Sequence, residues 1–176
     1  MNVGMLPLNA HELRPYWETF RGRHPEWRLR FHRTQFTDAF GALRRGDVDV
    51  LVSWLPVEEP DLTVGPVLFT DARVLAVSVD HELATRASVT LDTVADFQHP
   101  DAENVPDGWF DAYAPYHTRR GGTIERVMVR DVEDAMTFTS MAEVVTLFPA
   151  HMTRYWVRPD IAYLPVRDMG RLPYAL

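Results

Sequence analysis

The sequence contains no cysteine. Disulfides, thiolate metal sites and cysteine nucleophiles are therefore excluded, because each of them needs a thiol. Positive charge is also scarce: 18 lysines and arginines stand against 25 aspartates and glutamates, for a formal net charge of −7. An acidic chain is a poor binder of duplex DNA, since phosphate recognition needs clustered basic side chains. A reducing compartment fits this composition, so we expect a cytoplasmic protein.

Long apolar runs are missing as well. Nowhere do about 18 apolar residues follow one another, and the first residues lack a charged segment followed by an apolar core. We expect neither a membrane span nor secretion. The 176 residues are 46% hydrophobic and 24% charged, as in an ordinary globular protein. Their number fits one large domain or two small lobes that share a cleft.

The first part of the chain alternates between strand and helix patterns. The apolar run at 3–8 predicts a strand, and Asn9 and Glu12 have the spacing of a capping box before a helix that continues through Phe20. Residues 27–32 alternate between apolar and basic side chains. This second pattern predicts a strand at the edge of a sheet, where charges discourage further pairing.

Residues 48–54 form a continuous apolar strand, which is typical of a parallel sheet covered by helices on both faces. Thr37 and Asp38 are predicted to cap a short helix before it, and Gly46 has the place of a residue that ends a helix. Open sheets of this kind bind ligands at the carboxyl ends of their strands. The strand ends expected at one rim are Leu8 and Asn9, the loop 34–37, and Ser53 with Trp54.

The second part of the chain has the same α/β character. Residues 62–79 predict two strand segments with a break at Asp71, and Thr90 is expected to cap the next helix. Between 98 and 122 the sequence predicts loops with one short element at 108–114. A strand is expected at 123–129.

Asp131 has the capping spacing before an apolar helix, as the first helix region does. Residues 144–148 predict a strand, 150–156 a short helix and 161–166 a last strand. The final residues, 172–176, look like the beginning of an element that the chain does not finish.

From 42 to 97 the residues resemble the effector-binding, or substrate-binding, domain of LysR-type transcriptional regulators. The residues that match this family's pattern are Leu43, Gly46, Asp49, Leu62, Pro66, Leu68, Phe69, His81, Leu83, Ala84, Leu91 and Val94. The opening from Val3 to Phe20, His24 with Pro25, and the segment 141–156 also match, so the resemblance covers nearly the whole chain. One departure is the absence of the family's small residues before a late strand, where this chain has Ala142, Glu143 and Val144.

The resemblance implies an α/β fold of two Rossmann-like lobes with a hinge, like a type 2 periplasmic binding protein. The first lobe would comprise 1–72, with 165–176 returning toward it, and the second lobe 73–164. A small-molecule effector, with a polar or anionic group, would bind between the lobes. The family's cleft adds a strand-to-helix junction in the second lobe to the site. The expected effector-binding residues are Leu8, Asn9, Phe36, Thr37, Ser53, Trp54, Arg130, Asp131 and Val132.

Several of these residues have a second interpretation. Trp54 can pack in the core or form an apolar wall of the site. The hydroxyls of Ser53 and Thr37 can cap backbone groups or contact a ligand. Asp131 fits a helix cap better than a ligand contact, and the side chain of Arg130 can point either way.

The resemblance further implies a regulator without a cofactor, a metal or catalytic activity. It also implies an antiparallel, side-by-side homodimer, in which the helix around 10–23 of one copy meets a helix near 132–142 of the other. Twofold pairing of this kind uses each helix twice. DNA would be bound only through an amino-terminal helix-turn-helix domain that these 176 residues lack.

Two other classes share the fold. A transport solute-binding protein would need export, and a small enzyme would need a positioned acid or base. The seven histidines show no metal-binding spacing, and Asp47 and Asp49 fit the flanks of a strand better than a catalytic pair. The segment 119–122 lacks the lysine of a phosphate-binding loop, so a solvated turn is favoured.

Overall fold

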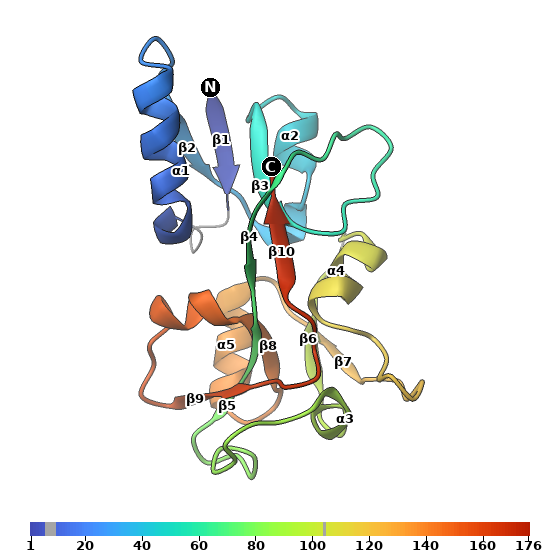
Figure 1. The fold of residues 1–176 in the computed structure, drawn as a ribbon. Coiled ribbons are helices and arrows are strands. Elements are labelled where there is room, and N and C mark those ends of the chain that lie inside the picture. Colours follow the sequence, from blue (N-terminus) through green and yellow to red (C-terminus); the bar gives the residue numbers. More distant parts are fainter. Residues whose placement is uncertain (6–9, 104) are drawn as a thin grey trace.

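The computed structural model describes residues 1–5, 10–103 and 105–176. Its larger sheet combines strands from the two ends of the chain (Figure 1). The strands are β1 (Asn2–Met5), β2 (Arg30–Arg33), β3 (Val50–Trp54), β4 (Val67–Asp71) and β10 (Leu172–Ala175). Their order is β2-β1-β3-β10-β4, with β1 parallel to β2 and β3 and with β10 antiparallel to β3 and β4. The predicted edge strand is therefore at the edge, and the predicted central strand is central.

The interpretation of 172–176 as an unfinished element was wrong. These residues contain β10, which fills the place between β3 and β4. The reason is visible in the burial of the strand, because Leu172 and Tyr174 are each only 1% exposed and pack in the core of this sheet. The last residues thus complete the first lobe.

The second lobe is built on a smaller sheet and a separate strand pair. The sheet has the order β8-β5-β9, and β6 runs parallel to β7. These strands are β5 (Arg73–Ser78), β6 (His99–Asp101), β7 (Arg126–Met128), β8 (Thr146–Pro149) and β9 (Ile161–Pro165). The short strand β6 was missed within the predicted loops, because three residues that include Pro100 give no recognisable strand pattern.

Five α-helices and two 3₁₀ turns are described. They are α1 (Ala10–Arg23), η2 (Phe36–Asp38), α2 (Gly41–Arg44), α3 (Leu91–Val94), α4 (Asp107–Tyr113), α5 (Val132–Ser140) and η3 (Ala150–Arg154). The predicted caps of α3 and α5 are confirmed: the Thr90 hydroxyl accepts from the Thr93 N–H at 3.3 Å, and the Asp131 carboxylate accepts from the Asp134 N–H at 3.0 Å. The segment expected to be a short helix at 150–156 contains the 3₁₀ turn η3.

The expected capping of α2 by Thr37 and Asp38 was wrong. Both residues lie inside the turn η2, and the residue before α2 is Phe40, which has no side-chain cap. The Asp38 carboxylate instead accepts from Arg45 Nη2 at 2.8 Å, so it forms an ion pair and does not cap the helix. Gly46 has a φ of +72°, as expected for a residue that ends a helix.

The turn after α5 keeps a left-handed backbone without a glycine. Ala142 has a φ of +58°, a conformation that costs a residue with a Cβ roughly 1 kcal/mol relative to glycine. The departure from the family's small residues at 142–144 therefore leaves a left-handed turn here, with alanine in place of glycine.

Two crossovers connect the lobes, one between β4 and β5 and one between β9 and β10 (Figure 1). Arg171 joins them, because its Nε and Nη2 donate to the Thr70 hydroxyl at 2.9 Å and the Thr70 carbonyl at 2.6 Å. Buried Arg73 donates to the carbonyls of Gly170, Ala112 and Tyr113, and so links both crossovers to the end of α4. The two-lobed arrangement that the resemblance implied is present.

Candidate functional site

A cavity of about 290 Å³ lies between the two lobes. The turn η2 and the end of β3 form its wall in the first lobe. In the second lobe the wall comes from β6, α4, β7, the start of α5, β8 and η3 with the residues after it. The volume is at the lower end of the range for small-molecule sites.

The structure brings several of the expected site residues to this cavity. Phe36, Thr37 and Trp54 line it from the first lobe, and Asp131 and Val132 line it from the second. The strand ends and the strand-to-helix junction therefore meet at one place, as the sequence predicts. Leu8 and Asn9 lie outside the described residues.

Ser53 and Arg130 are not among the residues that line the cavity. Ser53 is 9% exposed, and its hydroxyl accepts from the indole Nε1 of Trp109 at 3.0 Å. The side chain of Arg130 is 87% exposed and pairs with Asp134, with 2.6 Å between Nε and Oδ2. Ser53 therefore contacts a tryptophan that packs against the cavity wall, and Arg130 faces solvent.

Both interpretations of Trp54 hold at once. Its indole is buried and stacks on Trp109, with 3.9 Å between ring centroids and 11° between planes, while the residue also lines the cavity. Trp54 Nε1 donates to the Trp109 carbonyl at 2.9 Å, and Tyr113 lies 4.7 Å away on the same stack. Since Trp109 and Tyr113 belong to α4, this stack joins β3 to the helix.

His99 is a polar residue of the cavity that the sequence did not reveal. It is fully buried on β6, and its Nε2 lies 2.9 Å from the Val94 carbonyl. Since a carbonyl only accepts, Nε2 carries the proton and Nδ1 is a lone-pair acceptor. Burial lowers the pKa of His99 to about 4, against the opposing effect of the Val94 hydrogen bond, so the ring is neutral near pH 7.

Arg126 is the second polar residue that sequence reasoning missed. Its guanidinium donates to the carbonyls of Pro100, Ala114 and Pro115, and its Cζ lies 4.7 Å from the centroid of the Tyr116 ring. Burial lowers its pKa, while nearby Asp101 raises it. His99 falls in the region 98–122 that reads as loops, whereas Arg126 lies in the strand predicted at 123–129. In neither case did the local pattern indicate a place at the cavity.

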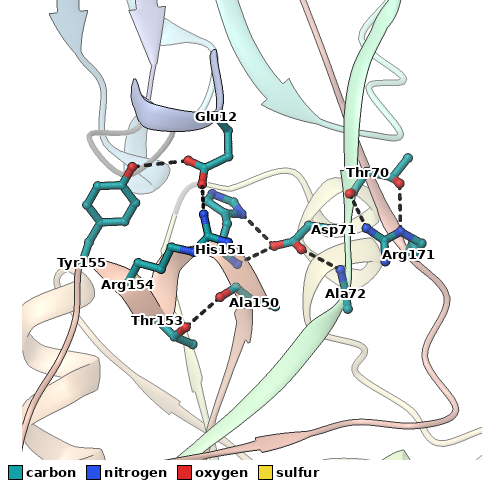
Figure 2. Close-up of polar contacts among 10 residues, drawn as sticks. All are labelled: Glu12, Thr70, Asp71, Ala72, Ala150, His151, Thr153, Arg154, Tyr155 and Arg171. Carbon is teal, nitrogen blue, oxygen red and sulfur yellow. Dashed lines mark hydrogen bonds and ion pairs between the residues drawn. The ribbon is translucent and has the colours of Figure 1, made fainter. Parts of the chain in front are cut away.

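The segment η3 connects the cavity to the first lobe. Met152 and, just after η3, Trp156 line the cavity. Figure 2 shows the other contacts of this segment: Arg154 and the Tyr155 hydroxyl reach the Glu12 carboxylate of α1 at 3.4 and 3.3 Å. A single short segment thus contacts both the cavity and the helix α1.

The same segment is tied to the end of β4 (Figure 2). The backbone N–H and Nδ1 of His151 both donate to Asp71 Oδ2 at 2.7 Å, and the Ala72 N–H donates to Asp71 Oδ1 at 2.9 Å. Burial opposes ionisation of Asp71, but these hydrogen bonds outweigh it and lower the pKa of the carboxyl. Hydrogen bonds through Asp71 therefore hold η3 against the chain between β4 and β5.

Within residues 1–5, 10–103 and 105–176, no group of three or more His, Asp or Glu side chains could hold a metal ion. In the same ranges, no helix is long and apolar enough to cross a membrane.

Solved structures with the same fold include several regulators. The chain aligns with the full-length BenM E226K mutant at a TM-score of 0.74 and 19% identity, over 99% of this chain and 59% of that one. It aligns with the BenM effector binding domain with its effector benzoate at 0.73 and 19%, over 99% and 81%. For the effector binding domain of QuiR in complex with shikimate, the values are 0.73 and 15%, over 99% and 85%.

These identities are low enough that the likeness shows the fold alone. The chain spans about three fifths of the full-length regulator that it matches. No curated protein sequence matches it significantly.

The family comparison is more direct, because it covers the chain almost from end to end. A family model described as the LysR substrate binding domain matches residues 2–176. This confirms the resemblance that the sequence carried, and the family is regulatory rather than catalytic. The chain therefore belongs to the substrate-binding, or effector-binding, domains of LysR-type regulators.

Proposed function

We propose that this chain is a sensor that binds a small organic effector in the cavity between its lobes and thereby controls transcription. The observation that carries the proposal is the cavity itself, whose wall is shared by η2 and β3 of one lobe and by α5 and η3 of the other. A ligand that touches both lobes has different affinities for different lobe arrangements. Such a difference is what a ligand needs in order to shift a conformational equilibrium.

Relatives with this fold support the choice of a small organic ligand. BenM is described with benzoate as its effector, and QuiR is described in complex with shikimate. Both molecules are single rings with a carboxylate, and a single ring fits the volume of the cavity found here. On this proposal Phe36, Thr37, Trp54, Asp131 and Val132 contact the effector.

Ser53 and Arg130 take part indirectly in this scheme. Ser53 holds the indole of Trp109, which in turn supports Trp54 in the cavity wall. Arg130 pairs with Asp134 in the first turn of α5 and so orients the start of that helix. Leu8 and Asn9 remain proposed contacts from the end of the first strand.

We propose lobes of 1–72 with 165–176, and of 73–164. The first boundary lies between β4 and β5, and the second lies before Pro165, the last residue of β9, just ahead of the crossover to β10. DNA would be bound by a helix-turn-helix domain joined to this chain in a full-length cytoplasmic regulator. The homodimer would pair α1 with α5 of a second copy, and a strictly monomeric mass by light scattering at high concentration would contradict that part.

Two alternative classes, a transport solute-binding protein and an enzyme on the same fold, make different predictions. Turnover of a bound compound would replace the sensor with the enzyme. Binding without any effect on the DNA affinity of the full-length protein would favour the solute-binding class. The family's regulatory character supports the sensor.

A thermal-shift screen with a metabolite collection tests the proposal. A ligand at about a hundred times its dissociation constant stabilises the native state by about 2.7 kcal/mol. Thr37→Trp fills the cavity and should abolish the shift, because Thr37 lines it. The matched control Thr63→Trp changes an exposed threonine and should preserve the shift.

Both variants must melt near the wild-type temperature without ligand for this comparison to hold. A shift that survives Thr37→Trp would place the ligand elsewhere. No shift from any compound in the collection would count against a sensor of small organic molecules.

A further inference from the structure

We propose that one end of the first lobe, at residues 21–30, contacts the sugar–phosphate backbone of duplex DNA without reading its sequence. We call this surface the arginine end, and its basic side chains are Arg21, Arg23, Arg28 and Arg30. The inference rests on the proposed function in one respect, since a helix-turn-helix domain joined to this chain would bring the DNA. It goes beyond that function because it gives this domain a DNA contact of its own.

The charge of the arginine end is opposite to that of the whole chain. With histidine neutral, residues 21–30 contain four arginines and one glutamate, which give a net charge of +3, whereas the chain carries −7. The expectation that DNA is bound only through another domain rested on that total. At physiological salt, exposed charges more than about 8 Å apart are largely screened, so the local charge decides a contact.

The arginines of this surface are exposed and have no carboxylate partner. Every residue from 21 to 28 is exposed, and so is Arg30. Among the described residues, none forms an ion pair or a hydrogen bond with these four guanidinium groups, and Arg21 Cζ lies 5.7 Å from the centroid of the Phe31 ring. Seven other arginines do pair with carboxylates: Arg14, Arg44, Arg45, Arg120, Arg130, Arg154 and Arg158. Unused guanidinium groups suit a partner that is rich in acceptor oxygens, because each of them has five N–H donors.

Local roles explain single members of this set but not their gathering. Arg21 and Arg23 lie in the last turn of α1, where a cation interacts favourably with the helix dipole. Arg30 begins the edge strand β2, where charge discourages pairing with another chain. Neither role applies to Arg28, and like charges placed together repel one another. A surface that gathers all four suits an anionic partner.

Arginines from two segments border the same hollow. An open hollow at this end is lined by Arg21 of α1 and by Arg28, together with Trp27, which is 51% exposed. Glu26 also lines the hollow, and its carboxylate lies 3.4 Å from Nδ1 of His24. A backbone phosphate at this hollow would lie beside two guanidinium groups, and the indole would offer an apolar surface to the adjacent sugar.

The place of the arginine end favours DNA as the partner. The turn after α1 and the amino terminus lie at the same end of the first lobe, away from the second lobe (Figure 1). The Met1 ammonium donates to the Arg28 carbonyl at 3.0 Å. A DNA-binding domain joined at the amino terminus would therefore be attached beside these arginines.

The proposed dimer contact does not require this surface. The helix α5 has 9 residues and α1 has 14, so α5 spans only about two thirds of the length of α1. Arg28 and Arg30 lie beyond the end of α1. The arginine end and the dimer contact can therefore be tested separately.

Binding of a random-sequence duplex of about 30 base pairs to the 176-residue chain tests the inference. At low salt, the backbone amide resonances of residues 21–30 should shift in nuclear magnetic resonance spectra. With four phosphate contacts, the logarithm of the affinity should fall with the logarithm of the salt concentration with a slope of about −3.6. The absence of binding at about 20 mM salt, or shifts confined to other segments, would overturn the inference.

Paired variants connect the effect to these side chains. Arg28→Gln with Arg30→Gln should weaken binding about tenfold or more and should reduce the slope by about 1.8, because two phosphate contacts are lost. Arg86→Gln with Arg167→Gln is the matched control: it changes the net charge equally at two exposed arginines of the second lobe, and it should leave the slope unchanged. Equal losses in both pairs would assign binding to the net charge and contradict a local surface.

A conservative pair and a measurement of mass complete the test. Arg28→Lys with Arg30→Lys keeps both charges and should retain the wild-type slope, and its loss would contradict phosphate binding. If Arg28→Gln with Arg30→Gln dissociates a dimer in sedimentation equilibrium and leaves DNA binding unchanged, the arginine end is an interface with a second copy, and the inference is wrong.

These outcomes are separate from those of the proposed function. A chain that binds metabolites but no DNA keeps the sensor and loses the DNA contact. A chain that binds DNA through the arginine end but no compound of the metabolite collection keeps the DNA contact and loses the sensor.

Discussion

The two lobes meet on two flanks that differ in chemistry. On one flank, which we call the aromatic flank, Trp54 of β3 stacks on Trp109 and Tyr113 of α4. On the other, the polar flank, η3 is bound to Glu12 of α1 and to Asp71 at the end of β4. In Figure 1, α4 lies to the right of the central strands and α1 to the left.

The aromatic flank is buried, and its two tryptophans donate hydrogen bonds to each other. Trp54 and Trp109 are 3% and 5% exposed, and each indole N–H donates to a carbonyl of the other tryptophan, at 2.9 and 3.2 Å. Trp109 also packs in one cluster with Leu51 and Tyr174 of the first lobe. By sequence α4 belongs to the second lobe, but its packing joins it to the first.

The polar flank has a long, exposed contact at its outer edge and a short, buried one inside. Arg154 is 68% exposed at its side chain and lies 3.4 Å from Glu12, whereas the Asp71–His151 contact is buried and 2.7 Å long. Exposed ion pairs contribute little to stability because water and salt screen them. Separating the lobes should therefore cost less free energy at the outer edge of the polar flank than at the aromatic flank. We expect the lobes to part first between α1 and η3, with the aromatic flank as the fixed side.

The largest effect is expected from Trp109→Ala. The change removes a buried indole, a stacking partner and two hydrogen bonds, and we expect a loss of about 3–5 kcal/mol in the free energy of unfolding. Urea denaturation measures it. Trp27→Ala, at a tryptophan that is 51% exposed, serves as the control and should cost far less. A loss at Trp109 below that at Trp27 would contradict the assignment of the fixed side.

The buried part of the polar flank comes second. Asp71→Asn places an amide against two donors of His151, and we expect a loss of about 1–3 kcal/mol near pH 7. The pH dependence has a definite sign. Since the folded state lowers the pKa of Asp71, its ionisation contributes stability above about pH 4, the unfolded value, and this contribution disappears as the pH falls through the folded value.

Unfolding curves at several pH values check this prediction. The difference between wild type and Asp71→Asn should be constant above about pH 5 and should shrink below about pH 4. A difference that grows on acidification would show that the carboxylate does not stabilise this junction.

The flanks also show what the sequence could reveal. The strand at 48–54 and the break between two strands at Asp71 were predictable, because continuous apolar runs and their interruptions are local patterns. The stack of Trp54 on Trp109 was not, since the two residues are 55 positions apart and lie in elements whose packing no local pattern records. The same reason hid His99, whose β6 strand has only three residues.

For the candidate site, the sequence indicated positions that border the cavity, whereas the contacts of individual side chains could not be predicted from it. Strand ends indicated where Thr37 and Trp54 would lie, because the carboxyl ends of parallel strands share one edge of a sheet. The direction of the Ser53 hydroxyl depended on Trp109, a partner from the other lobe. The place of β10 depended on a long return of the chain from the second lobe, which five residues could not show.

A smaller effect is expected from Ser53→Ala. The Trp109 indole N–H keeps its second acceptor, the Trp54 carbonyl at 3.2 Å, so the loss should be near 1 kcal/mol rather than that of an unpaired donor. Urea denaturation measures the loss. Ser88→Ala, at a serine for which the structure shows no side-chain hydrogen bond, is the control. A loss as large as that of Trp109→Ala would mean that the serine, and not the stack, holds this flank.

The smallest effect on stability is expected from Glu12→Gln, at the outer edge of the polar flank. The amide oxygen can still accept from the Tyr155 hydroxyl, while the weak ion pair with Arg154 is lost, so the cost should be below about 1 kcal/mol. Its local effect should be clearer. Burial and the Glu12 charge raise the pKa of Tyr155, and removal of the charge should lower it toward the ordinary value for tyrosine.

Ultraviolet titration of the tyrosines and amide hydrogen exchange measure these local changes. Faster exchange should be confined to α1 and the segment 150–156, because only these elements share the contact. Glu18→Gln is the matched control: it removes a carboxylate of the same helix that pairs with Arg14 at 2.7 Å and does not touch η3. If both variants loosen α1 alone and leave 150–156 unchanged, then Glu12 does not join the lobes, and the flanks differ less than their contacts indicate.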